Sequence, residues 1–200
     1  MEKQLIISIG REFGSCGHEI AEKLAEKFSL KLYDKNLLQH IAEERNVDGK
    51  HLEKYDEVPR NLLFSRTVKG LSNSMEENIA NMQFDYLRKK AEKGESFVVV
   101  GRCSETILKD YPGLVSIFVL GDKEHKIERV MRLYHMSAEE AEHYIFRQDR
   151  KRKGYHNYYC KGKWGDSRNY EISVNSSKLG EDATAEVLAD YITKRRNGIK

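Results

Sequence analysis

The sequence predicts an α/β protein in which a parallel sheet of about five strands lies between layers of helices. Short apolar runs alternate along the chain with stretches whose apolar residues recur at helical spacing. Several of the apolar runs have no polar interruption, which is typical of parallel strands buried on both faces. The predicted strands cover residues 5–9, 30–33, 97–100, 114–120 and 170–174.

Helical spacing fills most of the sequence between these strands. The segment from Ser137 to Glu140 matches a capping box and opens one of the helices. Breakers and polar composition predict loops over residues 46–60 and 154–169. The predicted helices cover residues 20–28, 37–42, 61–93 (with a break near 70–73), 105–108, 123–134, 137–152 and 181–195.

Composition narrows the class of protein. Two hundred residues suffice for one sizeable core, so we expect a single domain over residues 1–200. No apolar run approaches the roughly 20 residues of a membrane span. Three widely spaced cysteines show no metal-ligand spacing, and the start lacks a signal-peptide pattern, so we expect a cytoplasmic protein. A net charge of +3 favours anionic ligands only weakly and gives no reason to expect a nucleic-acid partner. We expect no membrane partner, because no apolar run is long enough to span a bilayer.

A glycine-rich loop follows the first predicted strand. Gly10, Gly14 and Gly17 fall between that strand and the helix that begins near Ile20. A strand, a glycine loop and a helix in this order direct backbone N–H groups and a helix N-terminus at a phosphate. The alternative is a tight strand-to-helix turn that binds nothing. The loop therefore predicts a phosphate site, and the remainder of the chain has to support it.

The loop departs from the strict phosphate-loop pattern GxxxxGK[ST]. Residues 14–19 resemble the GxGKGT segment of nucleoside monophosphate kinases, with Gly17 at the lysine position and Glu19 at the magnesium-binding hydroxyl position. Arg11 is a candidate replacement for the missing cation, because arginine binds phosphate bidentately. For Glu19 we favour charge complementarity with the helix N-terminus over a metal-ligand role.

The ends of the other predicted strands carry residues of the same kind. Asp34-Lys35, Gly101-Arg102 and Gly121-Asp122 follow three of them, as Gly10-Arg11 follows the first. Ligands of parallel sheets bind beyond the carboxyl ends of the strands. Glycines that admit close backbone approach, mixed with acids and bases, predict a phosphate and metal site at this edge.

Several segments together resemble the cytidylate kinase-like family of P-loop proteins, over nearly the full length of the chain. The resemblance implies a three-layer P-loop NTPase-like fold with a helical lid, here at about residues 123–168. The matching segments are ISIGREFGSCGHEIA (7–21), LYDKNLL (32–38), VVVGRCSETIL (98–108), the helix with Arg129 and Arg132, RQDRKR (147–152) and WGDSRNYEISVNSS (164–177).

The resemblance implies phosphoryl transfer from ATP, with Mg²⁺, to a small acceptor, for which a nucleoside monophosphate is the first choice. Asp34 would bind magnesium or activate the acceptor, and Arg102 would bind the acceptor's phosphate. Arg129 and Arg147 would act from the lid, in a set that also holds Arg132, Arg150 and Arg152. The residues implied in nucleotide binding are Gly10, Arg11, Gly14, Ser15, Cys16, Gly17, His18 and Glu19.

Two departures from the cytidylate kinase pattern leave the acceptor open. Cys103 stands where an aspartate is expected, and His40 stands where a phosphate-binding arginine is expected. The lysine and the hydroxyl of the phosphate loop are absent, so a second interpretation is a nucleotide-binding or regulatory protein with little catalysis. A third interpretation is a kinase that acts on a small molecule other than a nucleotide. Segment 61–93 could form a homodimer face or shape the acceptor pocket.

Cysteines and aromatic residues near the predicted site also allow two interpretations. Cys16 and Cys103 are either reactive thiols or ordinary buried ones, and we favour the second. The aromatic residues between Tyr155 and Trp164 either stack on a nucleotide, contact nucleic acid, or fold onto the body of the protein.

Overall fold

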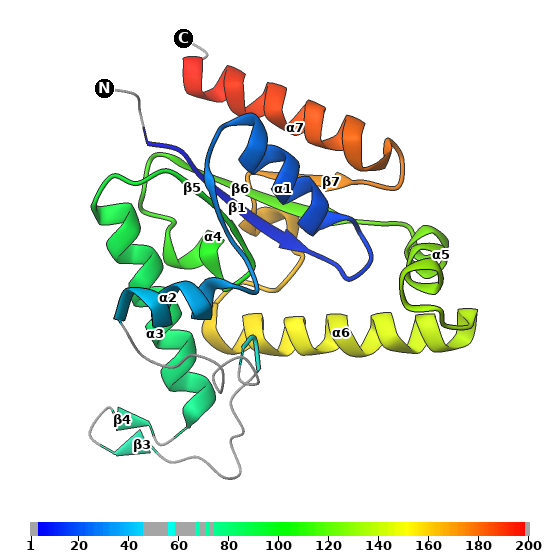
Figure 1. Cartoon of the computed structure of the whole chain (residues 1–200), viewed down its shortest axis with the longest axis horizontal. Coiled ribbons are helices and arrows are strands. Elements are labelled where there is room, and N and C mark those ends of the chain that lie inside the picture. The colour runs from blue at the N-terminus through cyan, green and yellow to red at the C-terminus, as the bar shows by residue number, and fades with distance from the viewer. Residues whose placement is uncertain (1–3, 46–55, 59–66, 69–70, 73, 199–200) are drawn as a thin grey trace.

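Five parallel strands form the central sheet of the computed structural model (Figure 1). The structure describes residues 4–45, 56–58, 67–68, 71–72 and 74–198. The strand order is β2-β5-β1-β6-β7, so the first strand of the chain lies in the centre. The strands are β1 (Ile6–Arg11), β2 (Lys31–Tyr33), β5 (Phe97–Val100), β6 (Leu114–Leu120) and β7 (Ile172–Asn175).

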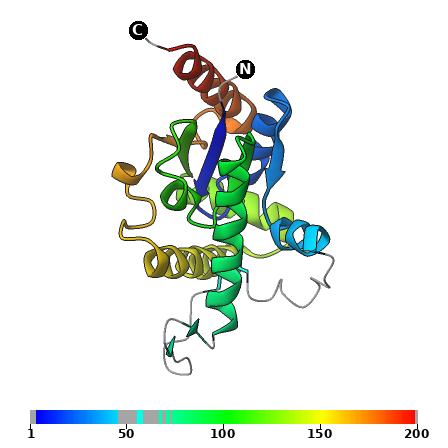
Figure 2. The same cartoon turned by 90° about the vertical axis from the view of Figure 1, so that its left-hand side faces the viewer.

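Helices cover both faces of this sheet (Figures 1 and 2). Helices α1 and α7 pack together on one face, and α2, α3 and α4 lie on the other. The three-layer α/β fold is therefore confirmed. The helices are α1 (Gly17–Lys27), α2 (Leu37–Arg45), α3 (Met75–Glu92), α4 (Ser104–Ile107), α5 (Lys123–Tyr134), α6 (Ala138–Tyr159) and α7 (Gly180–Asn197).

The alternation of side chains along β1 explains the three layers. Ile7 and Ile9 enter the apolar cluster with α1 and α7, whereas Ile6 enters the cluster with α2 and α3. All three are fully buried. Because neither face of the strand meets water, both faces carry apolar residues, which produces the uninterrupted run in the sequence. Each such side chain contributes about 1.5–3 kcal/mol through burial.

The prediction of a helix over residues 61–93 is wrong for part of the segment. Thr67–Val68 (β3) and Leu71–Ser72 (β4) pair as antiparallel strands, and β3 consists of two β-branched residues, which favour extended structure. Helix α3 begins after Ser74, whose hydroxyl accepts the backbone N–H of Glu77 and so caps the helix there. The loop predicted at residues 46–60 lies outside the described residues except for 56–58.

The loop prediction for residues 154–169 is also wrong at its start. Helix α6 continues to Tyr159, because Tyr155 and His156 are buried and hold the last turns against the body. A short 3₁₀ helix occupies Ser167–Asn169. The capping box at the start of α6 is confirmed, since Ser137 and Glu140 each bind the other's backbone N–H. None of the described helices combines the length and apolarity that a bilayer crossing needs.

Candidate functional site

A cleft of about 330 Å³ lies where the glycine loop meets the carboxyl ends of β1, β2 and β5. Its walls come from segments far apart in the sequence: the loop, the ends of two further strands, and helices α5 and α6. The lining side chains that matter below are those of Arg11, His18, Glu19, Asp34, Asp56, Glu57, Arg102, Arg129 and Arg152.

Side-chain hydrogen bonds hold the glycine loop against the end of β6. The Ser15 hydroxyl lies 2.9 Å from the Glu12 carbonyl oxygen and 3.1 Å from the Val119 carbonyl oxygen. Within the described part of the chain, the backbone N–H groups of residues 14–19 donate no hydrogen bond. Together with the N-terminus of α1 these donors form the kind of concavity that binds anions. The loop thus has the geometry expected of a phosphate cradle.

Gly17 explains why the usual lysine is missing. A Cβ atom at Gly17 would lie 2.5 Å from Cβ of Arg11, a separation that side chains do not tolerate. The stem of Arg11 therefore occupies the space from which a lysine at position 17 would grow. Its guanidinium extends past Gly17 to the turn after β5, where Nη1 would overlap a Cβ atom at Gly101, and it lines the cleft there.

Asp34 follows β2 and lies next to His18 of the first turn of α1. Oδ2 of Asp34 is 3.5 Å from Nε2 of His18, and Oδ1 accepts the backbone N–H of Asn36 at 3.0 Å. The same imidazole lies 3.3 Å from Oε1 of Glu22. Asp34 is 5% exposed, so its carboxylate is held in place beside the first turn of α1.

Arg102 sits on a tight turn that follows β5. Gly101, Arg102 and Cys103 all have positive φ angles, of 76°, 54° and 54°. Left-handed conformation is unfavourable for residues with a Cβ, and such strain is concentrated at functional sites. The Arg102 side chain is 2% exposed and donates through Nη1 to the Val100 carbonyl oxygen at 2.9 Å. Its Nε atom has no partner among the described residues.

Two carboxylates that the sequence did not predict hold these arginines. Glu57 forms a bidentate pair with Arg11, with Oε1 3.2 Å from Nη1 and Oε2 3.3 Å from Nη2. The same Oε1 accepts the backbone N–H of Arg102 at 3.2 Å. Asp56 contacts Nη2 of Arg102 and accepts from Nε2 of Gln83 at 3.0 Å. No periodicity or motif distinguishes Asp56 and Glu57 within their polar stretch, so the sequence carried no signal for them.

The pKa values of the two carboxyls move in opposite directions. Burial alone would raise the pKa of Glu57, but the guanidiniums of Arg11, Arg102 and Arg152 outweigh it and hold this pKa well below its usual range. Burial raises the pKa of Asp56, and Arg102 offsets only part of the rise. Glu57 is therefore a fixed anion between arginines.

The arginines of α5 and α6 divide into two groups. Arg129 contacts Oε1 of Glu19, and Arg152 lies in the cleft with Nη1 3.4 Å from the Arg11 carbonyl oxygen. Arg147 is exposed, lies over the Tyr144 ring and does not line the cleft. Glu19 thus pairs with an arginine of α5.

Two further contacts tie the loop to these helices and went unpredicted. Asp149 of α6 accepts the Phe13 backbone N–H at 2.7 Å. Lys126 of α5 donates to Oε2 of Glu12 at 2.7 Å.

Cys16 is a buried thiol rather than a reactive one. Burial raises the pKa of its thiol, despite the nearby Arg129.

The aromatic residues between Tyr155 and Trp164 pack against the body of the protein. Trp164 meets Phe118 edge-on at 5.4 Å between ring centroids, and Tyr155 is buried.

Comparison with known proteins places the chain in a family. Residues 6–178 match the cytidylate kinase-like family. An uncharacterized protein from Eubacterium ventriosum ATCC 27560 has a solved structure with 40% identity and a TM-score of 0.77, over 96% of this chain and 100% of that one. No curated protein sequence matches this chain.

Two shikimate kinases share the fold. The structure from Bacteroides thetaiotaomicron has 12% identity and a TM-score of 0.56, over 95% of this chain and 99% of that one. The structure from Acinetobacter baumannii, in complex with shikimate, has 11% identity and a TM-score of 0.54, over 100% of this chain and 97% of that one. At these identities the likeness concerns the fold alone.

Proposed function

We propose that this chain, which belongs to the cytidylate kinase-like family, transfers a phosphoryl group from ATP to a small acceptor. The observation that carries the proposal is the cradle of unpaired backbone N–H groups at residues 14–19, with the Arg11 guanidinium in the same cleft. A nucleoside monophosphate is our first choice of acceptor.

The donor's phosphates would lie against the N-terminus of α1, where the backbone N–H groups and the helix dipole favour negative charge. Arg11 would supply the charge that a phosphate-loop lysine otherwise provides. Arg129 and Arg152 line the same cleft from α5 and α6, which we propose form a lid over about residues 123–168. Phosphoryl transfer depends chiefly on positioning and charge stabilisation, and these groups supply both.

The acceptor would bind beside the donor's phosphates, at Arg102, with the Arg11 guanidinium shared between the two. In the structure the Glu57 carboxylate occupies a site made by the Arg11 guanidinium and the Arg102 backbone N–H. An anionic group of the acceptor fits the same donors, so we propose that it takes the place of Glu57. A buried guanidinium recognises phosphate or carboxylate with fixed geometry, which favours an acceptor that carries such a group.

Asp34 has the chemistry that Mg²⁺ prefers, a buried carboxylate oxygen beside the phosphate cradle. Mg²⁺ bound there would neutralise charge on the donor's phosphates. The neighbouring His18 holds Oδ2 of Asp34 in place.

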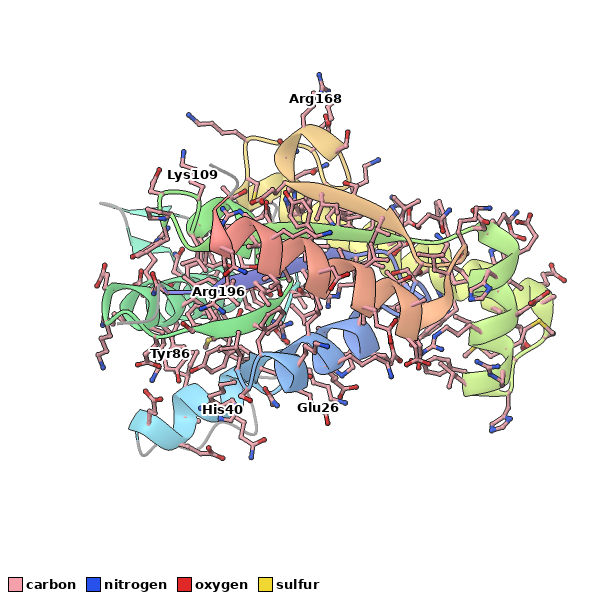
Figure 3. All side chains as sticks on the ribbon, turned by 90° about the horizontal axis from the view of Figure 1, so that it is seen from above. Glu26, His40, Tyr86, Lys109, Arg168 and Arg196 are labelled. Atoms are coloured by element: carbon pink, nitrogen blue, oxygen red, sulfur yellow. The ribbon has the colours of Figure 1, made fainter. Side chains whose placement is uncertain are left out.

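ADP formation from ATP and Mg²⁺ tests the proposal. The acceptors are nucleoside monophosphates and, because of the shared fold, shikimate. We expect one acceptor to raise turnover well above the rate without acceptor, and Arg102→Ala to abolish the increase. Arg168→Ala is the matched control, since this arginine is 86% exposed and projects from the body (Figure 3). Turnover that persists in Arg102→Ala would contradict the assignment of the acceptor site.

A nucleotide-binding protein with little catalysis is the second candidate. It is favoured by one observation: Glu57 and Asp56 already neutralise Arg11 and Arg102. A binding protein should gain thermal stability with nucleotide and Mg²⁺ but form no ADP with any acceptor. Absence of both stabilisation and turnover would exclude the phosphate site altogether.

A further inference from the structure

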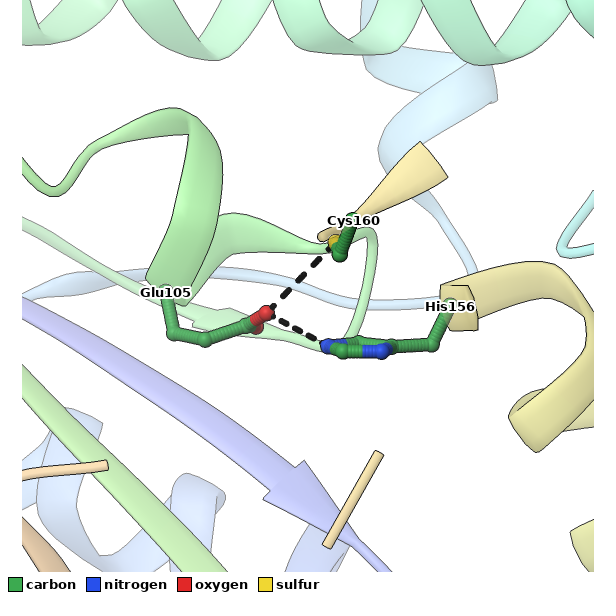
Figure 4. A group of neighbouring side chains, drawn as sticks. All are labelled: Glu105, His156 and Cys160. Atoms are coloured by element: carbon green, nitrogen blue, oxygen red, sulfur yellow. Dashed lines mark hydrogen bonds and ion pairs between the residues drawn. The ribbon is translucent and has the colours of Figure 1, made fainter. Parts of the chain in front are cut away.

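A second cluster of functional side chains lies behind Arg102, outside the cleft. It consists of Glu105 from the first turn of α4 and of His156 and Cys160 at the end of α6 (Figure 4). Their exposed fractions are 6%, 5% and 7%. One oxygen, one nitrogen and one sulfur atom from these residues all lie within 4.8 Å of one another. Nothing in the proposed phosphoryl transfer uses them.

The side chains converge on one carboxylate oxygen. Oε1 of Glu105 lies 2.8 Å from Nε2 of His156, 3.8 Å from Sγ of Cys160 and 2.9 Å from the hydroxyl of Thr106. His156 and Cys160 are four residues apart, and the Cys160 N–H donates to the His156 carbonyl oxygen, so both side chains leave the same helix face. Three potential ligands are thus preassembled from two elements.

A neighbouring contact orients the imidazole. Nδ1 of His156 lies 3.4 Å from Oδ1 of Asn157, and this oxygen also accepts the Trp164 backbone N–H at 2.9 Å. Oδ1 is therefore the amide's acceptor atom, and Nδ1–H is the donor. That leaves the lone pair of a neutral imidazole on Nε2, which faces Oε1 of Glu105. At 2.8 Å a proton joins Nε2 of His156 to Oε1 of Glu105 in a hydrogen bond, and a metal ion that binds both atoms would displace that proton.

Space for a fourth ligand adjoins the cluster. A cavity of about 20 Å³ is lined by Glu105 and His156 but not by Cys160, and its other lining residues include Cys103, Tyr155, Tyr170 and the arginines Arg11, Arg102 and Arg152. That is room for about one water molecule. Among the described residues, the hydroxyl of Tyr155 is buried without a hydrogen-bond partner. This unpaired group is suited to hold a metal-bound water.

We propose that Glu105, His156 and Cys160 form a binding site for a divalent transition-metal ion of the zinc class. Nitrogen, sulfur and carboxylate oxygen are the ligands of Zn²⁺, whereas Mg²⁺ and Ca²⁺ select oxygen. The hydrogen bond from Nδ1 to Asn157 is the outer contact that metal-binding histidines commonly make. The ion would join α4 to the end of α6, directly behind the turn that presents Arg102.

Cobalt titration of the full-length, reduced and chelator-stripped protein tests the site. We expect one equivalent of Co²⁺ to give the intense visible bands of tetrahedral coordination and a thiolate-to-cobalt charge-transfer band, both removed by Zn²⁺. Weak bands of octahedral coordination, or a spectrum without the thiolate band, would overturn the proposal. This measurement uses the unaltered protein, so it does not depend on whether a variant folds.

Variants then assign the ligands. We expect Cys160→Ser to abolish the charge-transfer band and His156→Gln to abolish stoichiometric Zn²⁺ binding. Asn157→Ala should weaken the affinity about ten- to a hundredfold while one equivalent still binds. The matched controls are Cys16→Ser and His143→Gln, which alter a thiol in another cluster and an exposed histidine on the same helix. Equal binding by the Cys160 and His156 variants and by the controls would mean adventitious binding elsewhere and would refute the site.

Discussion

At the scale of single residues, the site depends on how Arg11 and Gly17 share space. Each would be ordinary alone: an arginine at a strand end and a glycine at a helix start. Together they exclude a lysine from the loop, because a Cβ at position 17 would overlap the Arg11 stem. The packing therefore leaves no room for a lysine at position 17.

Restoring the usual lysine should therefore harm the protein. We expect Gly17→Lys to lower the free energy of unfolding by about 1–3 kcal/mol, the usual cost of overpacking, without raising nucleotide affinity. Urea unfolding and nucleotide titration measure the two effects. Gly17→Ala carries the same Cβ without the charge and should lose a similar amount of stability. A Gly17→Lys protein that is as stable as the wild type and binds ATP more tightly would contradict the assignment to Arg11.

Glu57 should contribute a pH-dependent part of the stability. Its pKa in the folded state is lowered from 4.5, despite its burial, by Arg11, Arg102 and Arg152. The contribution is therefore fully present above pH 4.5 and is lost as the pH falls below it. The raised pKa of Asp56 acts in the opposite direction, so a variant at Glu57 is needed to isolate the effect.

We expect Glu57→Gln to cost about 1–3 kcal/mol at neutral pH, the range for a hydrogen bond to a charged group. The difference from the wild type should shrink as the pH is lowered through the ordinary carboxyl range. Urea unfolding at a series of pH values measures it. Glu26→Gln, an exposed change on α1 (Figure 3), should show no such trend. A difference that stays constant with pH would disprove the role of the Glu57 charge.

At the scale of elements, α6 holds the glycine loop through one carboxylate. Asp149 accepts the Phe13 backbone N–H at 2.7 Å, from a helix more than a hundred residues further along the chain. Because Phe13 directly precedes the cradle, this bond should set the position of the loop. Burial raises the pKa of Asp149, despite the hydrogen bond from Phe13.

Asp149→Ala should weaken nucleotide binding and lower the free energy of unfolding by about 1–3 kcal/mol, since it leaves a partly buried N–H unpaired. Asp149→Asn keeps an oxygen that accepts from Phe13, and we expect it to retain most of the stability and the affinity. Nucleotide titration and urea unfolding of both variants measure this. If both variants lose the same amount of stability and nucleotide affinity, then the negative charge of Asp149, and not its hydrogen bond to Phe13, holds the loop.

Elements with a strong local pattern could be predicted from the sequence, and those defined by distant contacts could not. The run from Phe97 to Val100 and the capping box of α6 were predicted correctly, because apolar continuity and cap chemistry are local. The last turns of α6 were not, since they depend on the burial of Tyr155 and His156 against other elements. Asp56 and Glu57 were missed for the same reason: their partners Arg11 and Arg102 lie far away in sequence.

At the scale of the whole molecule, the cleft brings together six segments of the chain, three of which are strand ends that the sheet places at one edge. Strands β1, β2 and β5 deliver Arg11, Asp34 and Arg102 from their carboxyl ends, as a parallel sheet requires. Helices α5 and α6 complete the wall with Arg129 and Arg152. These two helices pack on each other. Asp149 accepts the Phe13 backbone N–H, Lys126 pairs with Glu12, and Arg129 pairs with Glu19 at the start of α1.

Hydrogen exchange with and without nucleotide can establish whether residues 123–168 move as a lid. Binding should link Arg129 and Arg152 to the phosphates, so local opening of α5 and α6 should become rarer. We expect ATP with Mg²⁺ to slow amide exchange in α5 and α6 more than in α3, which does not line the cleft. Arg11→Ala, which weakens binding of the phosphates, should reduce the protection in proportion to occupancy. Equal protection in all three helices would mean that nucleotide stabilises the whole molecule, and it would contradict the proposal that residues 123–168 move as a lid.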